Sequence, residues 1–427
     1  MHKTATPIYS LSKSSIPAKV NRHVSYRVKW FKAIFIFLLI CPVLLANAQE
    51  KPAEKKHKKR KTFIIEAQYA AGKVMSVYGG FPKSTFVNIV EVHLGYQTAG
   101  ESQWNKIFNY PRLGMSFIYQ NLGNNAVFGQ QFSIVPTVYF STARKENAKV
   151  YAEFRYGLGL ACFNKIYNDS TNRTNYMVGE HFTWQFTIGA NLHYNISPYL
   201  SLQVGGMWYH ASDSHTALPN VGMNTFGGFA ALSIYPFGRV ARSHVYDTMA
   251  VENRWHANFR FGSGYQAKGG PFGPEFGHKY AVYTGAVYAS KRVGKVFLLK
   301  AGAIYRYYPM YLSIIQGDPS YTSNLKLNSS AFIIFGGTEF LLGHFAINVE
   351  AGIDIYKPAY KTYAKDYLGK ATKFNYYLGR YLATRFGVHY YILDPYTHMR
   401  NNVFVGANVS ANSGEAEFLE LNVGYVF

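Results

Sequence analysis

The sequence predicts an all-β protein: an antiparallel transmembrane β-barrel of about sixteen strands that arose from a diverged duplication. Three observations support this class. The 427-residue chain is 17% aromatic but only 15% charged, many segments alternate between apolar and polar residues, and turn residues recur between these segments. Membrane barrels have this composition because their outer face is apolar and their aromatic side chains lie at the lipid interfaces.

The first 48 residues predict a secretory signal peptide. They contain no Asp or Glu, and a basic leader precedes the apolar run AIFIFLLICPVLLANA, which ends in small residues before Gln49. This pattern predicts export, with cleavage before Gln49. A lipoprotein anchored at Cys41 is the alternative, but Ile40 is larger than the small residue that usually precedes such a cysteine. After cleavage Cys162 is the one remaining cysteine, so no disulfide framework is expected.

Residues 49–61 predict a basic periplasmic tail, because they include the run KPAEKKHKKRK. The whole chain has a formal net charge of +22 at pH 7, which raises the alternative of a nucleic-acid-binding arm. In an exported chain a solvated tail beside anionic lipid headgroups is the better interpretation. We therefore expect outer-membrane lipids as partners and no nucleic acid.

The alternation of apolar and polar residues is clearest in two segments. In 182–194 the even-numbered residues, from Phe182 to Tyr194, are mostly large and apolar, whereas the odd-numbered ones are polar or small. The last segment alternates in the same way from Leu419 to the terminal Phe427. Side chains of a strand point to opposite faces with a period of two, so one face is expected to contact lipid and the other a polar interior.

The other segments fall into two sets of eight predicted strands, with uncertain ends. The first set comprises 62–70, 88–98, 111–120, 130–142, 148–163, 181–195, 199–212 and 224–237, and the second 254–266, 277–290, 294–308, 330–341, 342–355, 379–393, 399–412 and 415–427.

The two sets resemble each other at both ends. TFIIEAQYAAGK at the start of the first set is echoed by ANFRFGSGYQAKG in the second, and FAALSIYPF by FLELNVGYVF. The predicted organisation is therefore a first barrel half (62–237), a periplasmic connection (238–253) and a second barrel half (254–427). Either eight or sixteen strands can close into a barrel. We favour one sixteen-stranded barrel, with two eight-stranded units as the alternative.

His210 and Ser212 are polar residues on an otherwise apolar face of the predicted strand 199–212. They share their parity with Leu202 and Val204, and they lie at the far end from the short turn at 196–198. Short turns of such barrels are periplasmic, so the pair is expected at the outer-leaflet edge, facing lipid. A histidine that accepts the proton of a serine hydroxyl converts it into a nucleophile for esters. An ester within reach there is the acyl ester of lipopolysaccharide.

The segment YHASDSHTALPNVGMN resembles the active-site segment of the lipid A 3-O-deacylase family, which consists of outer-membrane barrels. Two upstream segments, NYPRLGMSFIYQNLGN and YGLGLACFNKIYNDSTNRTNYMVGEHF, are similar to its larger, acyloxyacyl-hydrolase-like members. The resemblance implies an ester hydrolase that acts on lipid A, with Ser212 as the nucleophile and His210 as the base. The matching motif residues are His210, Ser212, Pro219, Asn220 and Gly222.

The chain departs from this family at two positions. Asp213 stands where the family often has Asn, and Asn224 stands where its best-known members have the Glu that orients the histidine. An amide orients an imidazole but does not stabilise its charged form as a carboxylate does. Glu180 is a candidate replacement, because a hairpin centred on Ser197 would pair 182 with 212 and place Glu180 beside the serine. Asp213 is a second candidate acid.

The remaining roles and alternatives follow from the same segment. Asn220 and the backbone amides of 213–220 are candidate donors to an oxyanion. The histidines near it lack zinc-type spacing, so neither a metal nor a cofactor is expected. In the second half, FGVHYYILDPYTH aligns Ile392 with His210, so this half would lack the His/Ser pair. A non-catalytic barrel, either a channel or a lipid-binding relic, is the alternative function.

Overall fold

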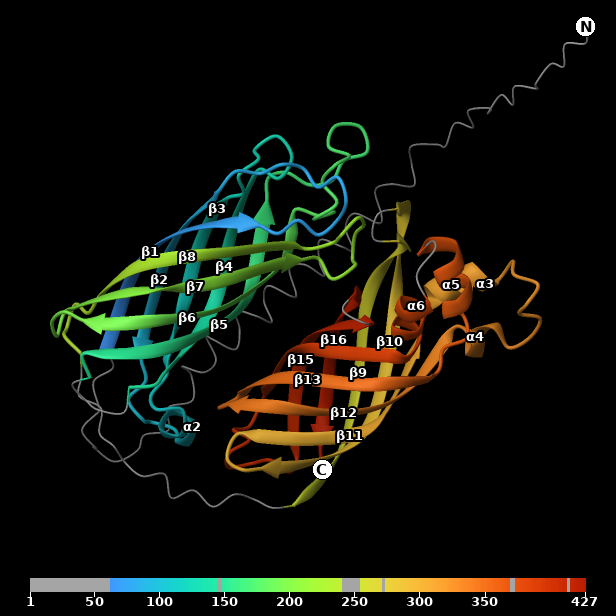
Figure 1. The fold of residues 1–427 in the computed structure, drawn as a ribbon. Coiled ribbons are helices and arrows are strands. Elements are labelled where there is room, and N and C mark those ends of the chain that lie inside the picture. Colours follow the sequence, from blue (N-terminus) through green and yellow to red (C-terminus); the bar gives the residue numbers. More distant parts are fainter. Residues whose placement is uncertain (1–61, 144–147, 240–253, 271–272, 369–372, 413–414) are drawn as a thin grey trace, which may run out of the picture. The chain divides into compact units, whose positions relative to one another are not determined.

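The computed structural model describes residues 62–143, 148–239, 254–270, 273–368, 373–412 and 415–427. They form two closed antiparallel barrels of eight strands each (Figure 1). The predicted all-β class is thus confirmed. The single sixteen-stranded barrel is wrong and the alternative of two eight-stranded units holds, because β1 pairs with β8 and β9 pairs with β16. The predicted signal peptide, the basic tail and most of the 238–253 connection lie outside the described residues.

The first barrel contains eight strands and one short helix in the connection after β2. Its elements are β1 (Thr62–Val74), β2 (Val87–Gln97), α2 (Gln103–Ile107), β3 (Arg112–Asn121), β4 (Gln130–Ser141), β5 (Val150–Phe163), β6 (Phe182–Asn195), β7 (Leu200–Ser212) and β8 (Met223–Ile234).

The second barrel has the same strand order, and four helices lie in its two longest connections. Its elements are β9 (Trp255–Gly270), β10 (Gly273–Val293), β11 (Phe297–Tyr307), α3 (Pro309–Ile315), α4 (Leu325–Asn328), β12 (Ser330–Leu342), β13 (Phe345–Tyr356), α5 (Tyr360–Tyr367), α6 (Lys373–Tyr381), β14 (Leu382–Tyr391), β15 (Asn402–Asn412) and β16 (Glu415–Val426). No helix among the described residues is long and apolar enough to cross a membrane.

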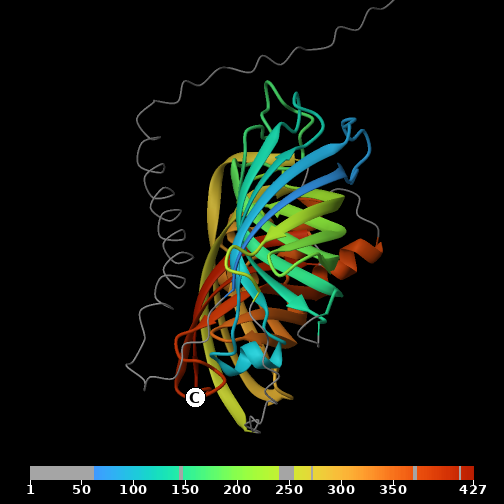
Figure 2. The same cartoon turned by 90° about the vertical axis from the view of Figure 1, so that its left-hand side faces the viewer.

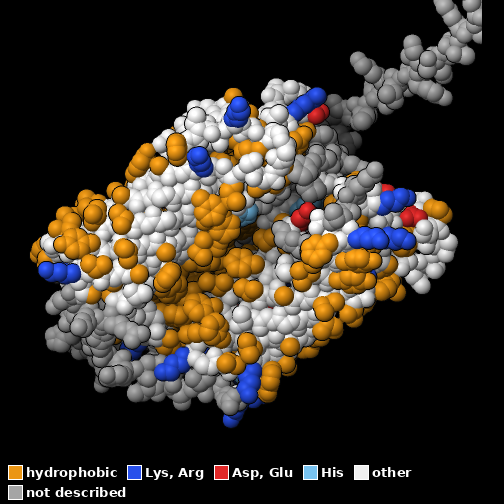
Figure 3. All heavy atoms as spheres, in the orientation of Figure 1, with side chains coloured by type: hydrophobic (Ala, Val, Ile, Leu, Met, Phe, Trp, Pro, Cys, Tyr) orange, Lys and Arg blue, Asp and Glu red, His pale blue; other side chains and the backbone are white. Residues whose placement is uncertain are grey.

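Strand β7 shows how the alternating sequence is used. Leu202 and Val204 on the outer face are 41% and 50% exposed, whereas Gln203 between them is buried in the barrel interior. The face of the first barrel visible in Figure 3 carries many hydrophobic side chains over its strands. An apolar exterior around a polar interior is the reverse of a water-soluble protein and is the arrangement that a lipid environment favours.

The interiors of both barrels contain buried ion pairs beside clusters of buried hydrophobic side chains. In the first barrel, the Arg112 guanidinium donates to Glu66 at 3.0 Å and to Glu153 at 2.7 Å. In the second, Arg260 donates to both carboxylate oxygens of Glu350, at 2.6 and 3.1 Å. Charges removed from water require such partners. An eight-stranded barrel is just wide enough for its side chains to fill, and these pairs occupy that space.

The two ends of the first barrel differ in their connections. The loop between β6 and β7 is the short segment 196–199, and the longer segment 98–111 with α2 lies at the same end. The segments 75–86, 164–181 and 213–222, each longer than 196–199, connect strands at the opposite end. These longer loops gather at one end of the first barrel (Figure 1 and Figure 2). In barrels of this kind, the long loops are extracellular. Ser212, at the end of β7, lies at that end.

The predicted similarity between the two halves is confirmed for the first and last strands of each barrel but not around Ile392. The echoed segments form β1 and β9, and β8 and β16, the first and last strands of each barrel. Ile392, by contrast, directly follows β14, the sixth strand of its barrel, whereas His210 lies on the seventh strand of the other. The predicted alignment of Ile392 with His210 is therefore wrong, because similar aromatic patterns recur in neighbouring strands.

Candidate functional site

The candidate site lies on the outer face of β7, at its end, and in the loop 213–222 that follows. His210 and Ser212 are partly exposed, whereas Tyr209 and Ala211 between them are each 1% exposed and point into the barrel. The parity predicted from the sequence therefore holds. A register shifted by one residue would have turned both polar side chains into the interior.

Two donors converge on the Ser212 hydroxyl. Asn220 Nδ2 donates to Ser212 Oγ at 2.9 Å, and the backbone N–H of Ser214 donates to the same oxygen at 3.1 Å. The Asn220 side chain is held in turn by the Asp213 N–H, which donates to its Oδ1 at 3.5 Å. Both donors leave the serine proton free to be donated elsewhere, and both would stabilise negative charge that develops at this point.

Asn224 is the partner of His210. The two residues face each other directly across the β7–β8 pair, and His210 Nδ1 lies 2.9 Å from Asn224 Oδ1. An amide oxygen only accepts hydrogen bonds, so Nδ1 carries the proton and the lone pair lies on Nε2. This is the tautomer that a general base requires.

Gly222 is needed for the loop to reach this histidine. Its φ of +84° lies in the left-handed region, and a Cβ there would come within 2.9 Å of His210 Cε1. Glycine alone adopts this backbone conformation readily and allows so close an approach. The motif glycine therefore has a structural reason, which is to let the loop backbone pack against the imidazole.

The predicted hairpin register for Glu180 is wrong by two residues. Trp184, not residue 182, pairs with Ser212, and Phe186 pairs with His210. The hairpin turns about Pro198, not Ser197, because the turn 196–199 is one residue longer than the predicted turn 196–198. Glu180 precedes the start of β6 at Phe182, and the side chain in contact with His210 Nδ1 is that of Asn224.

Asp213 is buried in the loop, with 2% of its surface exposed. Burial, followed by the negative charge of nearby Glu180, raises the pKa of Asp213 to about 8. Its Oδ1 accepts a 3.5 Å hydrogen bond from the Ala217 N–H. The raised pKa disfavours the charged form of Asp213, so this carboxyl group is a poor source of negative charge for the imidazole.

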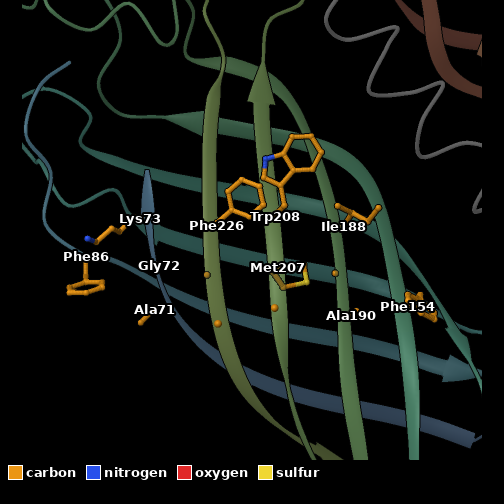
Figure 4. A pocket seen from close by; sticks show the side chains of 14 residues that line it. Ala71, Gly72, Lys73, Phe86, Phe154, Ile188, Ala190, Met207, Trp208 and Phe226 are labelled. Carbon is orange, nitrogen blue, oxygen red and sulfur yellow. The ribbon is translucent and has the colours of Figure 1, made fainter. Parts of the chain in front are cut away.

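A groove of about 640 Å³ runs across the outer face of the first barrel on the strands that carry the site (Figure 4). Its floor includes Gly206 and Gly228, which pair across β7 and β8. A Cβ at either glycine would meet no other atom closer than 3.8 Å, so both leave open space. Trp208 and Phe226 form an aromatic wall between this floor and the His210–Asn224 pair.

Sequence reasoning named four side chains that the structure places in two hydrogen-bonded pairs, but it missed two groups. His210 contacts Asn224, and Ser212 contacts Asn220. No three His, Cys, Asp or Glu side chains of the described chain form a metal-binding group. The Ser214 N–H was not foreseen individually, because its position depends on the loop backbone. Trp208 was also missed, although its parity places it on the same face, two residues before His210.

Together the fold and the cluster define a class: a membrane β-barrel that carries a Ser/His/Asn cluster on its outer surface. Residues 90–233, which lie within the first barrel, match the family model described as lipid A 3-O-deacylase (PagL). The match includes all four clustered side chains. It agrees with the family resemblance predicted from the sequence.

Comparison with solved structures gives distant similarities. The chain is 16% identical to the outer-membrane enzyme PagL over 39% of this chain and 97% of that one, with a TM-score of 0.30. Neisserial surface protein A is 13% identical over 42% and 99% of the two chains, with a TM-score of 0.30. The N-terminal barrel of Pseudomonas aeruginosa OprF is 11% identical over 41% and 100%, with a TM-score of 0.25. No curated protein matches the chain significantly.

Proposed function

We propose that the first barrel is an outer-membrane ester hydrolase that removes an acyl chain from lipid A of lipopolysaccharide. The observation that carries the proposal is that the family match at 90–233 contains a polar cluster of the kind that ester hydrolysis needs. Ser212 is the nucleophile, His210 the base, and Asn224 orients the base. The predicted signal peptide would direct the chain to the outer membrane.

On this proposal the reaction takes the following steps. Ser212 Oγ attacks the ester carbonyl carbon while His210 Nε2 takes its proton, and the carbonyl oxygen becomes an oxyanion. The Asn220 amide and the Ser214 N–H, which donate to Ser212 Oγ in the structure, would stabilise this charge. His210 then returns the proton to the leaving sugar oxygen, and the acyl group remains on Ser212. Water, deprotonated by His210, attacks this acyl-enzyme, and its collapse releases the fatty acid and restores the serine.

The position of the cluster supports a lipid substrate. His210 and Ser212 lie on the outer face, which on this proposal contacts lipid, and the groove of Figure 4 begins beyond Trp208 on that same face. Gly206 lies four residues from His210 along β7, about 13 Å at the usual rise per residue. This distance lies within one leaflet of a hydrocarbon core about 30 Å thick. An acyl tail would lie in the groove with its ester at the serine.

Mass spectrometry of lipid A tests the proposal. Cells that express the chain should contain lipid A that lacks one acyl chain, and Ser212→Ala and His210→Ala should each restore the full acyl number. The double variant should be no worse than either single one, because the two residues act as a unit. Ser201→Ala is a matched control, because this serine is on the same strand but points into the barrel.

A non-catalytic lipid-binding barrel is the second candidate, and the replacement of the family's Glu by Asn224 favours it. The channel alternative has less support, because buried ion pairs and hydrophobic side chains occupy the interior of the first barrel. Unchanged lipid A in cells with a folded wild-type barrel would contradict the hydrolase and leave the binding barrel.

A further inference from the structure

We infer that Trp208 is a positioning residue that enables Asn224, an amide, to orient the catalytic histidine where an acid would otherwise do so. The inference rests on the proposed function of His210 as the base. It concerns a residue two positions before His210, on the same outer face of β7.

An amide has an orientation problem that a carboxylate does not have. The two oxygens of a carboxylate are equivalent, so either one accepts a proton from His210 Nδ1. An amide has one oxygen and one NH₂ group, and a rotation of the group exchanges them. If the NH₂ group faced the imidazole, Nδ1 would become the acceptor and the ring proton would move to Nε2. The histidine would then be unable to accept the proton of Ser212.

Two hydrogen bonds hold Asn224 in the productive orientation. The Trp208 indole Nε1–H donates to Asn224 Oδ1 at 3.2 Å, and Asn224 Nδ2 donates to the Gly222 carbonyl oxygen at 3.3 Å. The indole nitrogen only donates, so it favours the oxygen and opposes the NH₂ group at this place. The Gly222 carbonyl only accepts, so it favours the NH₂ group at the other end. A reversed amide would lose both of these hydrogen bonds and would keep one to His210 only in the Nε2–H tautomer.

Aromatic neighbours fix the direction of the indole. Trp208 pairs across the strands with Phe226, and their rings stack with centroids 6.0 Å apart and planes 15° apart. On the other side, Phe186 meets the indole edge-on, with centroids 5.5 Å apart. Such pairs have preferred geometries and restrict the rotation of the ring. The indole N–H is therefore held toward Asn224, which lies diagonally opposite on β8.

The test is a double-mutant cycle with Trp208→Phe and Asn224→Asp. Phenylalanine keeps the aromatic wall and removes only the N–H, and aspartate replaces the amide by a group that has no wrong orientation. Trp208→Phe should lower kcat for lipid A deacylation at least about tenfold in the Asn224 background, with KM nearly unchanged. In the Asn224→Asp background, Trp208→Phe should lower kcat by less than about threefold. Trp255→Phe, a matched Trp→Phe change on β9, should leave kcat unchanged.

A second readout does not need activity. Nitrogen NMR of His210 in detergent micelles, assigned by comparison with His210→Gln, reports which ring nitrogen carries the proton. The native chain should show the Nδ1–H form. Trp208→Phe should shift His210 toward the Nε2–H form, and Trp208→Phe/Asn224→Asp should not.

The outcomes separate this inference from the proposed function. Equal losses of kcat in both backgrounds, or an unchanged tautomer in Trp208→Phe, would mean that Trp208 only shapes the lipid-facing surface, and the inference would fail. If the wild type hydrolyses no lipid A, the proposed function fails. The tautomer measurement still decides whether Trp208 orients the amide.

Discussion

His210 Nδ1 lies 2.9 Å from Oδ1 of Asn224, its direct cross-strand neighbour on β8. On the proposed function, this contact gives the orienting role to an amide, although Glu180 and Asp213 lie in the adjoining loops. It is the feature of the site most open to mutational test, because an amide and a carboxylate have nearly the same shape but differ in charge and in the NH₂ group.

Asn224→Ala should lower deacylation more than Glu180→Gln. The alanine removes the acceptor that holds the imidazole, so we expect a loss of about tenfold or more, whereas Glu180→Gln should change the rate less than about threefold. Asn224→Asp should raise the rate, because a carboxylate also stabilises the imidazolium. The rates are measured with purified lipid A in detergent. A larger loss from Glu180→Gln would mean that the acid acts on His210 in a conformation other than this one.

Asp213→Asn should change the pH dependence of stability. The pKa of Asp213 is raised from 3.8 to about 8, mainly by burial. Between these values the folded chain keeps a proton that the unfolded chain has lost, so the contribution of Asp213 to folding becomes less favourable as pH rises and levels off above about pH 8. The Asp213→Asn variant has no such group, so it lacks this loss of stability with rising pH. Its advantage in unfolding temperature over the wild type should therefore grow from pH 5 to pH 8. Parallel curves would show that Asp213 is ionised in the folded chain.

A shortened chain that ends at residue 239 should fold and keep its activity. Strand β1 pairs with β8, so the first barrel closes without any strand of the second. A closed sheet has no free edge, so we expect the shortened chain to resist SDS without heating. Electrophoresis of heated and unheated samples and a lipid A assay check the two properties. A shortened chain that migrates only in its unfolded form would mean that the first barrel needs the second to fold.

Arg112→Ala should destabilise the first barrel strongly. It would leave Glu66 and Glu153 buried without the guanidinium that both contact, at a cost of about 3–5 kcal/mol in the free energy of unfolding. Arg173→Ala is the control, because its ion pair with Asp169 is exposed and such pairs contribute less than about 1 kcal/mol. Urea titration in detergent measures both. Equal effects of the two variants would contradict a tightly packed interior.

Much of the fold follows from local pattern. Alternation of apolar and polar residues placed the strands of both halves, and it also assigned His210 and Ser212 to the outer face, because a strand has only two faces. The way in which the strands close into barrels did not follow from local pattern. Whether sixteen strands form one barrel or two depends on which edges pair, and β1 carries no local signal that it pairs with β8 and not with a more distant strand.

Within the site, the sequence by itself determined the residue types and their faces: Ser212, His210, Asn220 and Asn224 were all candidates. Only the tertiary structure decided their partners. A hairpin register displaced by two residues keeps every side chain on its face, so parity could not exclude the pairing that brought Glu180 to the serine. The cross-strand pairing of His210 with Asn224, and the indole of Trp208 that holds the amide, depend on the register of β7 against β8, which the turn and the whole closed sheet fix together.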